Sequence, residues 1–184
     1  MNHAYDKYLH EVLIDENTLL QRVAGLGEEI SKDYSECEDF LLICILKGGV
    51  MFLSDLTRHI VVPHEIDFMA VSSYGKGMRE STRNVRIDMD LTANLVGRHV
   101  LVVEDIIDSG HTLHFVMDVL KARKPASLKL CTLLDKPSRR EISLPIDYTG
   151  FQIEDKFVFG YGLDLDEKFR NLPFIGVVKA SSLE

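Results

Sequence analysis

The sequence predicts an α/β fold with a mainly parallel central sheet flanked by helices. The runs FLLICIL and HVLVV, at residues 40–46 and 99–103, are apolar on both faces, as central parallel strands are. Segments with helical spacing separate such strand-like runs, which is typical of a parallel α/β sheet. A chain of 184 residues can bury most of its apolar surface around one core, and we see no linker or repeat that divides it. We therefore expect a single domain over residues 1–184.

The first half of the chain predicts helices and strands in turn. Residues 15–34 predict an amphipathic helix, because their apolar side chains recur at helical spacing: Leu19, Leu20, Val23, Leu26 and Ile30. The strand at residues 40–46 is followed by a Lys-Gly-Gly turn and a predicted helix over residues 50–59. The run EIDFMAVSS, at residues 65–73, predicts the next strand.

The second half continues the same pattern. Residues 85–91 predict a half-buried strand, because their apolar side chains alternate: Val85, Ile87, Met89 and Leu91. The strand at residues 99–103 leads through a polar turn into a predicted helix over residues 112–123. Apolar runs predict three further strands, at residues 127–135, 156–163 and 174–180.

Composition and charge exclude several classes of protein. The formal net charge of −8 argues against nucleic acid as the main partner, because phosphate neutralisation needs a basic face. No apolar run approaches the roughly 20 residues that cross a bilayer, so no membrane partner is expected. The start MNHAYDKYLHEV lacks the layout of a secretion signal. Cys37, Cys44 and Cys131 are interpreted as reduced packing residues of a cytoplasmic protein.

The run LVVEDIIDSGHT, at residues 101–112, carries two kinds of polar group side by side. Three carboxylates follow its apolar start: Glu104, Asp105 and Asp108. Small polar residues of the kind that bind phosphate at a helix N-terminus come next: Ser109, Gly110 and Thr112. The carboxylates would repel a bare phosphate, but they suit hydroxyl groups and a Mg²⁺ ion. A sugar phosphate fits both halves, whereas the alternative is a solvated turn before an ordinary helix cap.

Four charged side chains each follow a predicted strand closely: Lys47, Asp105, Lys136 and Asp164. In open α/β sheets, ligands bind beyond the carboxyl ends of the strands. We therefore expect these four side chains to face one cleft.

The run VLVVEDIIDSGHT resembles the phosphoribosyl-pyrophosphate motif of the type I phosphoribosyltransferases. Four further segments resemble that family in order and spacing. LKGG, at residues 46–49, resembles its pyrophosphate-binding loop, and SSYG, at residues 72–75, resembles the start of its mobile lid. LLDKPSRR, at residues 133–140, resembles the segment that carries the purine-selecting lysine. DKFVFGYGLDLDEKFR, at residues 155–170, resembles the wall that binds purine and pyrophosphate. The last two segments mark the 6-oxopurine branch, the hypoxanthine-guanine enzymes of the short bacterial type. The resemblance extends from about residue 11 to residue 180.

The resemblance implies the type I phosphoribosyltransferase fold, with a small hood formed by the terminal segments. It implies a Mg²⁺-dependent purine-salvage transferase whose substrates are phosphoribosyl pyrophosphate and a 6-oxopurine. The phosphoribosyl group would pass to hypoxanthine and/or guanine, giving IMP or GMP and pyrophosphate. A homodimer or homotetramer is expected as well.

The resemblance also assigns roles within the acidic motif. Asp108 resembles the catalytic base that acts at purine N7; its alternative role is that of a helix N-cap. The family's phosphoribosyl-pyrophosphate-binding positions correspond to Glu104, Asp105, Asp108, Ser109, Gly110, His111 and Thr112. Relatives vary at His111, so we expect its backbone N–H rather than its ring to bind.

Other roles concern the leaving group and the metal ion. Lys47, Gly48 and Arg170 resemble the pyrophosphate contacts, and the family often has a cis peptide before this lysine. The metal contacts would be Glu104, Asp105 and, partly through water, Asp164. Alternatively, Asp164 is a surface residue in an acidic run, and the sequence favours neither role.

The purine site would be formed by Lys136, Phe157, Val158 and Asp164. Lys136 would pair with the 6-oxo group and reject adenine, because an ammonium group offers only donors; alternatively, it is a solvated loop residue. Phe157 would stack on the purine, although an aromatic in such a run is more often part of the core. Ser73 and Tyr74 would close the lid and exclude water.

Two rival functions remain at this stage. A signalling receiver domain also contains an apolar strand that ends in acidic residues, but it would place that pair near its start. A phosphoribosyl-pyrophosphate-sensing regulator could use the same fold. It would need a DNA-binding domain or a basic RNA-binding face, for which the chain has neither room nor charge. Magnesium-dependent IMP formation from hypoxanthine would separate enzyme from sensor.

Overall fold

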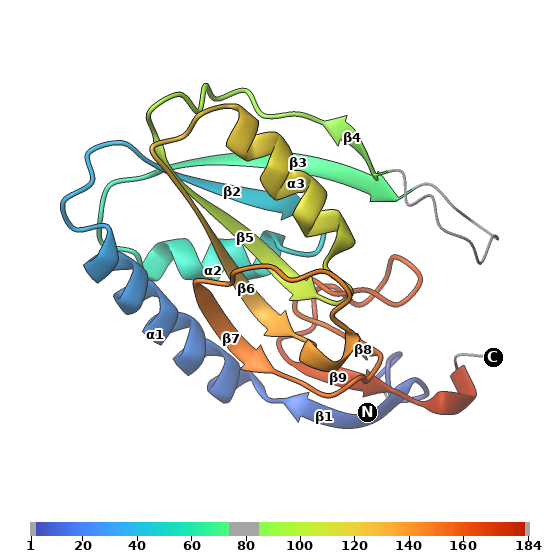
Figure 1. Ribbon diagram of the computed structural model, residues 1–184. Helices are drawn as coiled ribbons and strands as arrows, with labels where there is room; N and C mark the ends of the chain where they lie inside the picture. The colour runs from blue at the N-terminus through green and yellow to red at the C-terminus, as the bar shows by residue number, and fades with distance from the viewer. Residues whose placement is uncertain (1–2, 74–84, 183–184) are drawn as a thin grey trace.

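The computed structural model describes residues 3–73 and 85–182, which form two β-sheets and flanking helices (Figure 1). The main sheet has six strands in the order β4-β3-β2-β5-β6-β7. Five of them run parallel: β2 (Phe40–Leu46), β3 (Glu65–Ser73), β5 (His99–Ile107), β6 (Ser127–Asp135) and β7 (Tyr148–Gln152). The edge strand β4 (Val85–Met89) is antiparallel to β3. The predicted mainly parallel sheet is therefore confirmed.

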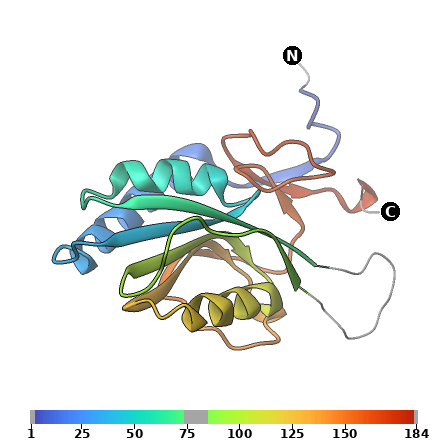
Figure 2. The ribbon, with the colours of Figure 1, turned by 90° about the horizontal axis from the view of Figure 1, so that it is seen from above.

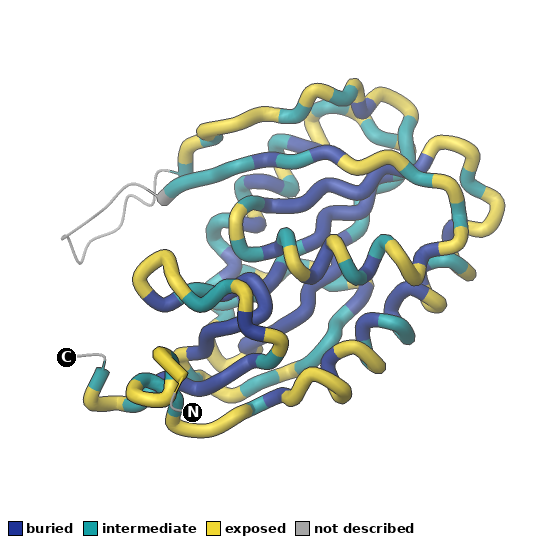
Figure 3. Tube along the Cα trace, turned by 180° about the vertical axis from the view of Figure 1, so that it is seen from behind, coloured by how far each residue is buried: buried dark blue, intermediate teal, exposed yellow. Residues whose placement is uncertain are grey.

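Helices cover both faces of the main sheet (Figure 2). On one face lie α1 (Glu16–Asp33) and α2 (Val50–His59), packed against each other and against strand residues such as Leu42 and Cys44. On the other face α3 (His111–Ala122) packs against Leu41 and Ile43, the alternate residues of the same strand. The central strands are accordingly buried on both sides (Figure 3), as their continuous apolar runs predict.

A second, three-stranded sheet forms the hood that the resemblance implied. In it β9 (Ile175–Val178) pairs antiparallel with both β1 (Leu9–Ile14) and β8 (Val158–Phe159). The hood lies beside the carboxyl ends of β5 and β6 (Figure 1). Short 3₁₀ turns at Pro137–Arg139 and Ala180–Ser182 complete the elements. No helix among the described residues is long and apolar enough to cross a membrane.

Four predicted strands differ in length from those observed: the strands predicted at residues 85–91 and 174–180 are shorter by two and three residues, and two others differ more. The strand predicted at residues 99–103 continues to Ile107, so Glu104 and Asp105 belong to β5 and not to a turn. Continued pairing with β6, such as Glu104 with Thr132, holds these acidic residues in the sheet. The strand predicted at residues 156–163 is only Val158–Phe159, because two glycines with positive φ, Gly160 and Gly162, turn the chain away. The strands β1 and β7 had not been predicted.

One residue of the predicted half-buried strand faces outward. Met89 is 42% exposed, although Ile87 on the same strand is partly buried. The register shifts between these residues, since Ala70 pairs with Met89 whereas Val71 pairs with Ile87. The extra residue forms a bulge that reverses the alternation of side chains.

Candidate active site

The predicted site residues lie at or just beyond the carboxyl ends of three parallel strands and in the loop beyond β8. Lys47 follows β2, directly after a cis peptide bond between Leu46 and Lys47. Asp105 projects from β5, and Lys136 follows β6. Asp164 lies in the loop beyond β8. The cis peptide agrees with what the resemblance implied.

Close packing at two glycines connects the turn after β2 with β5 and with the loop beyond β8. A Cβ atom added to Gly48 would lie 1.6 Å from Oδ2 of Asp105. A Cβ atom added to Gly162, whose φ is +101°, would lie 2.0 Å from the carbonyl oxygen of Gly48. A side chain at either position would displace backbone or a buried carboxylate. Glycine is therefore required where the turn after β2 meets Asp105 and Gly162.

Two adjacent acidic side chains are shielded from solvent at the end of β5. Asp105 is buried, and Oε2 of Glu104 is buried without a hydrogen-bond partner among the described residues. Burial, reinforced by the charge of Asp105, raises the pKa of Glu104 well above its usual range. Burial also raises the pKa of Asp105, although hydrogen bonds from Glu104 and from the Ile106 N–H oppose the shift. Two such carboxyls are stable together only when one holds a proton or a cation lies between them.

The residues predicted to bind phosphate follow β5 and lead into α3. Gly110 is the N-cap of α3 at φ +90°, without a side-chain cap, so Asp108 does not have the alternative role of N-cap. The first N–H groups of α3 have no intrahelical acceptors and can bind an anion. They face a pocket of about 180 Å³ that is lined by Glu104, Ile106, Ile107, Asp108, Ser109, Gly110, Thr112 and Leu113. The ring of His111 contacts Glu141 at 2.9 Å.

Asp108 projects beside the segment that follows β6. Nε of Arg139 donates a hydrogen bond to Oδ1 of Asp108 at 3.0 Å, and the two side chains are about half exposed. The hydrogen bond and the charge of Asp108 raise the pKa of Arg139. Asp108 therefore lies at the edge of this pocket, within reach of a ligand.

Lys136 lies in a different environment from a solvated lysine. Its side chain is only 8% exposed, and Nζ lies 3.7 Å from Oδ1 of Asp155. Its backbone N–H donates to the carbonyl oxygen of Ile107, the last residue of β5. The alternative of a solvated loop lysine is therefore wrong. Phe157 is 52% exposed, so it is not part of the core, whereas Val158 is buried in β8.

The remaining predicted cations meet at the loop beyond β8. Nζ of Lys47 lies 2.7 Å from Oε2 of Glu167. Nη2 of Arg170 lies 2.9 Å from Asp164 and 3.4 Å from the same oxygen of Glu167. Nη1 of Arg170 donates to the carbonyl oxygen of Gly162 at 2.8 Å. Lys47 and Arg170 thus share one carboxylate, although 123 positions separate them in the sequence.

The remaining predicted residues are Asp164, Ser73 and Tyr74, and three further residues were not predicted. Asp164 pairs with Arg170, and the described residues contain no group of three or more His, Cys, Asp or Glu side chains arranged for a metal ion. Ser73 ends β3, and the lid residue Tyr74 lies outside the described residues. Sequence reasoning missed Arg139, Asp155 and Glu167. Each lies inside a segment that the resemblance had marked, but only their contacts single them out.

Comparison with known proteins supports the resemblance to the phosphoribosyltransferases. A model of the phosphoribosyl transferase domain matches residues 13–168. The hypoxanthine phosphoribosyltransferases of Salmonella typhimurium and Escherichia coli are each 49% identical over 173 residues, covering 94% of this chain and 97% of theirs.

Solved structures agree with these sequence matches. A crystal structure of a hypoxanthine phosphoribosyltransferase from Staphylococcus aureus is 42% identical, with a TM-score of 0.93, over 100% of this chain and 99% of that one. A hypoxanthine-guanine phosphoribosyltransferase from Bacillus anthracis is 45% identical, with a TM-score of 0.87, over 94% of this chain and 99% of its own. These matches exclude the receiver domain. The chain belongs to the phosphoribosyltransferase family, among relatives that are hypoxanthine phosphoribosyltransferases.

Proposed function

We propose that this chain is a purine-salvage transferase that moves the phosphoribosyl group from phosphoribosyl pyrophosphate to hypoxanthine and/or guanine. The products are IMP or GMP and pyrophosphate. The observation that carries the substrate class is the burial of Lys136, whose side chain is 8% exposed and whose backbone N–H donates to Ile107, a residue that lines the pocket. A shielded ammonium group beside a sugar-phosphate site favours a ring with an oxygen acceptor.

Asp108 is the residue proposed to move a proton. In the reaction a purine nitrogen forms a bond to the anomeric carbon of the ribose, while the bond from that carbon to pyrophosphate breaks. The anomeric carbon passes through an oxocarbenium-like state. The purine loses a proton, which the carboxylate of Asp108 accepts at N7. The position of Asp108 at the rim of the phosphate pocket supports this role.

Lys47 and Arg170 are proposed to bind the pyrophosphate oxygens, with the backbone of Gly48 beside them. The close contact of Gly48 with Asp105 supports this arrangement, because it joins the pyrophosphate loop to the acidic pair. Oε2 of Glu104, which is buried without a partner among the described residues, and the adjacent Asp105 fit a divalent cation. These two carboxylates would hold Mg²⁺, whose charge would offset that of the leaving pyrophosphate; a contribution from Asp164 would pass through water.

Binding of the two substrates would use the rest of the site. Ser109 to Thr112, including the backbone N–H of His111, would hold the sugar phosphate at the start of α3. The exposed ring of Phe157 would stack on the purine, with Val158 and Asp164 beside it and Ser73 and Tyr74 closing the lid. We propose that all of these belong to one domain over residues 1–184. We also propose a cytoplasmic homodimer or homotetramer.

A four-purine assay tests the proposal. Hypoxanthine, guanine, xanthine and adenine are each incubated with phosphoribosyl pyrophosphate, with and without Mg²⁺, and nucleotide formation is followed by chromatography. We expect magnesium-dependent IMP or GMP and little AMP. Tight binding of phosphoribosyl pyrophosphate without any nucleotide product would favour the sensor instead.

A further inference from the structure

Glu167 lies where the proposed reaction would place an oxygen of pyrophosphate. A single oxygen, Oε2, lies 2.7 Å from Nζ of Lys47 and 3.4 Å from Nη2 of Arg170. These are the two cations proposed to bind the leaving group. A carboxylate oxygen between two cations carries negative charge, as a diphosphate oxygen does, and it occupies the position between the cations that the leaving group would need.

The backbone places Glu167 in this position. Asp166 and Glu167 have φ values of +52° and +61°, in the left-handed region that residues with a side chain seldom adopt. The turn is closed by reciprocal backbone hydrogen bonds between Leu165 and Lys168. The N–H of Glu167 also donates to Oδ2 of Asp164 at 2.9 Å. The turn therefore keeps the carboxylate beside the cations in a backbone conformation that would otherwise be unfavourable.

The ion pair with Lys47 can still open. The side chains of Lys47 and Glu167 are 69% and 67% exposed, so solvent screens the pair and its net contribution is small. Hydrogen bonds from Lys47 and then Arg170 lower the pKa of Glu167, so this side chain carries its charge at neutral pH. A ligand with several negative charges can displace a single screened carboxylate.

We propose that Glu167 is a positioning residue that substitutes for pyrophosphate when the site is empty. It holds Lys47 and Arg170 at one point, and it competes with pyrophosphate for both cations. This competition weakens the binding of the product and favours its release. The inference rests on the proposed function, because it takes pyrophosphate as the leaving group.

The test compares Glu167→Gln with Asp166→Asn in the full chain with Mg²⁺. Both substitutions remove one negative charge from the same turn, but no described ion pair involves Asp166. Inorganic pyrophosphate is titrated by calorimetry, and its product inhibition of IMP formation is measured. We expect Glu167→Gln to tighten pyrophosphate binding by about 2- to 10-fold, and Asp166→Asn by clearly less.

Each outcome decides the question. Unchanged or weaker binding in Glu167→Gln, or an equal gain in Asp166→Asn, would overturn the competition. If such a result came with normal IMP formation, the proposed function would stand while this inference failed. If Glu167→Gln bound pyrophosphate more tightly but neither wild type nor the variant formed IMP, Glu167 would be shown to compete with a diphosphate for the two cations, and the proposed reaction would be wrong. Equal melting temperatures would show that both variants are folded.

Discussion

Nε of Arg139 lies 3.0 Å from Oδ1 of Asp108 and donates a hydrogen bond to it, so the proposed base has a basic partner in the absence of substrate. The same guanidinium approaches Oδ2 of Asp155 at 3.8 Å. Because the side chains of Arg139 and Asp108 are 51% and 47% exposed, solvent screens their ion pair. Arg139 can therefore leave Asp108 at little cost when a purine arrives.

Arg139→Gln should leave the turnover number nearly unchanged and alter KM for hypoxanthine by no more than about fivefold. The reason is that a screened counter-ion contributes little in either direction. Steady-state kinetics would check this. A fall in kcat of more than about tenfold would instead show that Arg139 takes part in the chemical step.

Lys136→Ala should lose most of kcat/KM for hypoxanthine, whereas the already poor value for adenine should hardly change. A hydrogen bond to a charged group stabilises by about 1.5–3 kcal/mol, which corresponds to roughly 10- to 150-fold. Lys156→Ala is the matched control, because Lys156 pairs with Glu11 on the hood, 3.0 Å away. If both purines responded alike, Lys136 would not recognise the 6-position.

Glu104→Gln should stabilise the metal-free protein while abolishing most of its activity. Oε2 of Glu104 is buried without a described partner next to a second buried carboxyl. This arrangement destabilises the folded protein, and an uncharged amide at residue 104 would relieve it. We expect the free energy of unfolding in urea at neutral pH to rise by about 0.5–2 kcal/mol. Glu36→Gln removes the same charge at an exposed position and should change neither quantity. A destabilised Glu104→Gln variant would contradict the strain between the two carboxyls.

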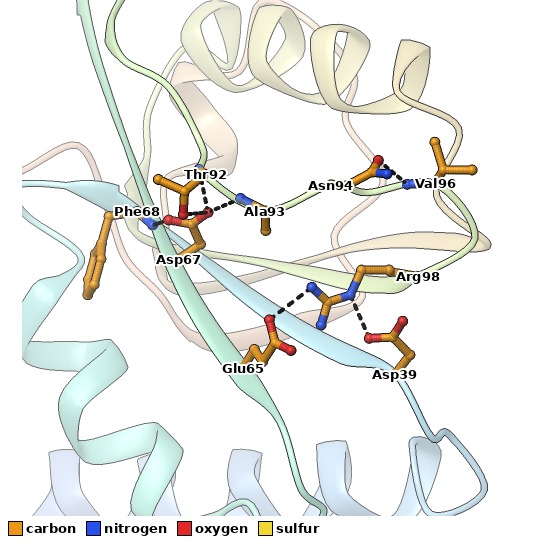
Figure 4. A network of polar contacts seen from close by, with 9 residues as sticks. All are labelled: Asp39, Glu65, Asp67, Phe68, Thr92, Ala93, Asn94, Val96 and Arg98. Carbon is orange, nitrogen blue, oxygen red and sulfur yellow. Dashed lines mark hydrogen bonds and ion pairs between the residues drawn. The ribbon is translucent and has the colours of Figure 1, made fainter.

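Asp67, on β3, binds the loop that follows β4 (Figure 4). Its Oδ2 accepts hydrogen bonds from the N–H groups of Thr92 and Ala93, at 2.8 and 2.9 Å. Burial alone would raise the pKa of Asp67, but the hydrogen bonds from Ala93, Phe68 and Thr92 outweigh it and lower the pKa. The ionised carboxylate is therefore the form that stabilises the fold.

Asp67→Asn should lower the free energy of unfolding by about 1–3 kcal/mol at pH 7. The difference from wild type should persist above the ordinary pKa of aspartate, near 3.9, and disappear as the pH falls through the lowered value. Chemical denaturation across this range would measure it. Asp39→Asn, at the exposed partner of Arg98 in Figure 4, should cost less than about 1 kcal/mol. A difference that grew at low pH would contradict this role for Asp67.

Most of the fold could be predicted because its buried strands are continuous apolar runs. The bounds of β2, β3 and β6 match the predicted residues. Glu104 and Asp105 had been assigned to a turn, because acidic residues are rarely buried in strands. Their pairing with β6 outweighs that preference. Residues at a functional site are where such local expectations are expected to fail.

The contacts of the site were harder to predict than its members. The resemblance marked Lys47 and Arg170, but the carboxylate that joins them depends on left-handed backbone at Glu167. Such a turn is set by hydrogen bonds within the loop beyond β8 and leaves no periodic signal in the sequence. Arg139 also was overlooked, because only the course of the chain after β6 brings it to Asp108.

Asp108 is proposed to accept the purine proton during phosphoribosyl transfer to a 6-oxopurine. Comparing wild type with Asp108→Asn tests this role most directly. IMP formation from hypoxanthine is measured with Mg²⁺, alongside the dissociation constant of phosphoribosyl pyrophosphate. Asp118→Asn, on the exposed side of α3, is the control. We predict nearly unchanged binding and turnover slowed by about 100-fold or more in Asp108→Asn. Wild-type turnover in that variant would contradict the account.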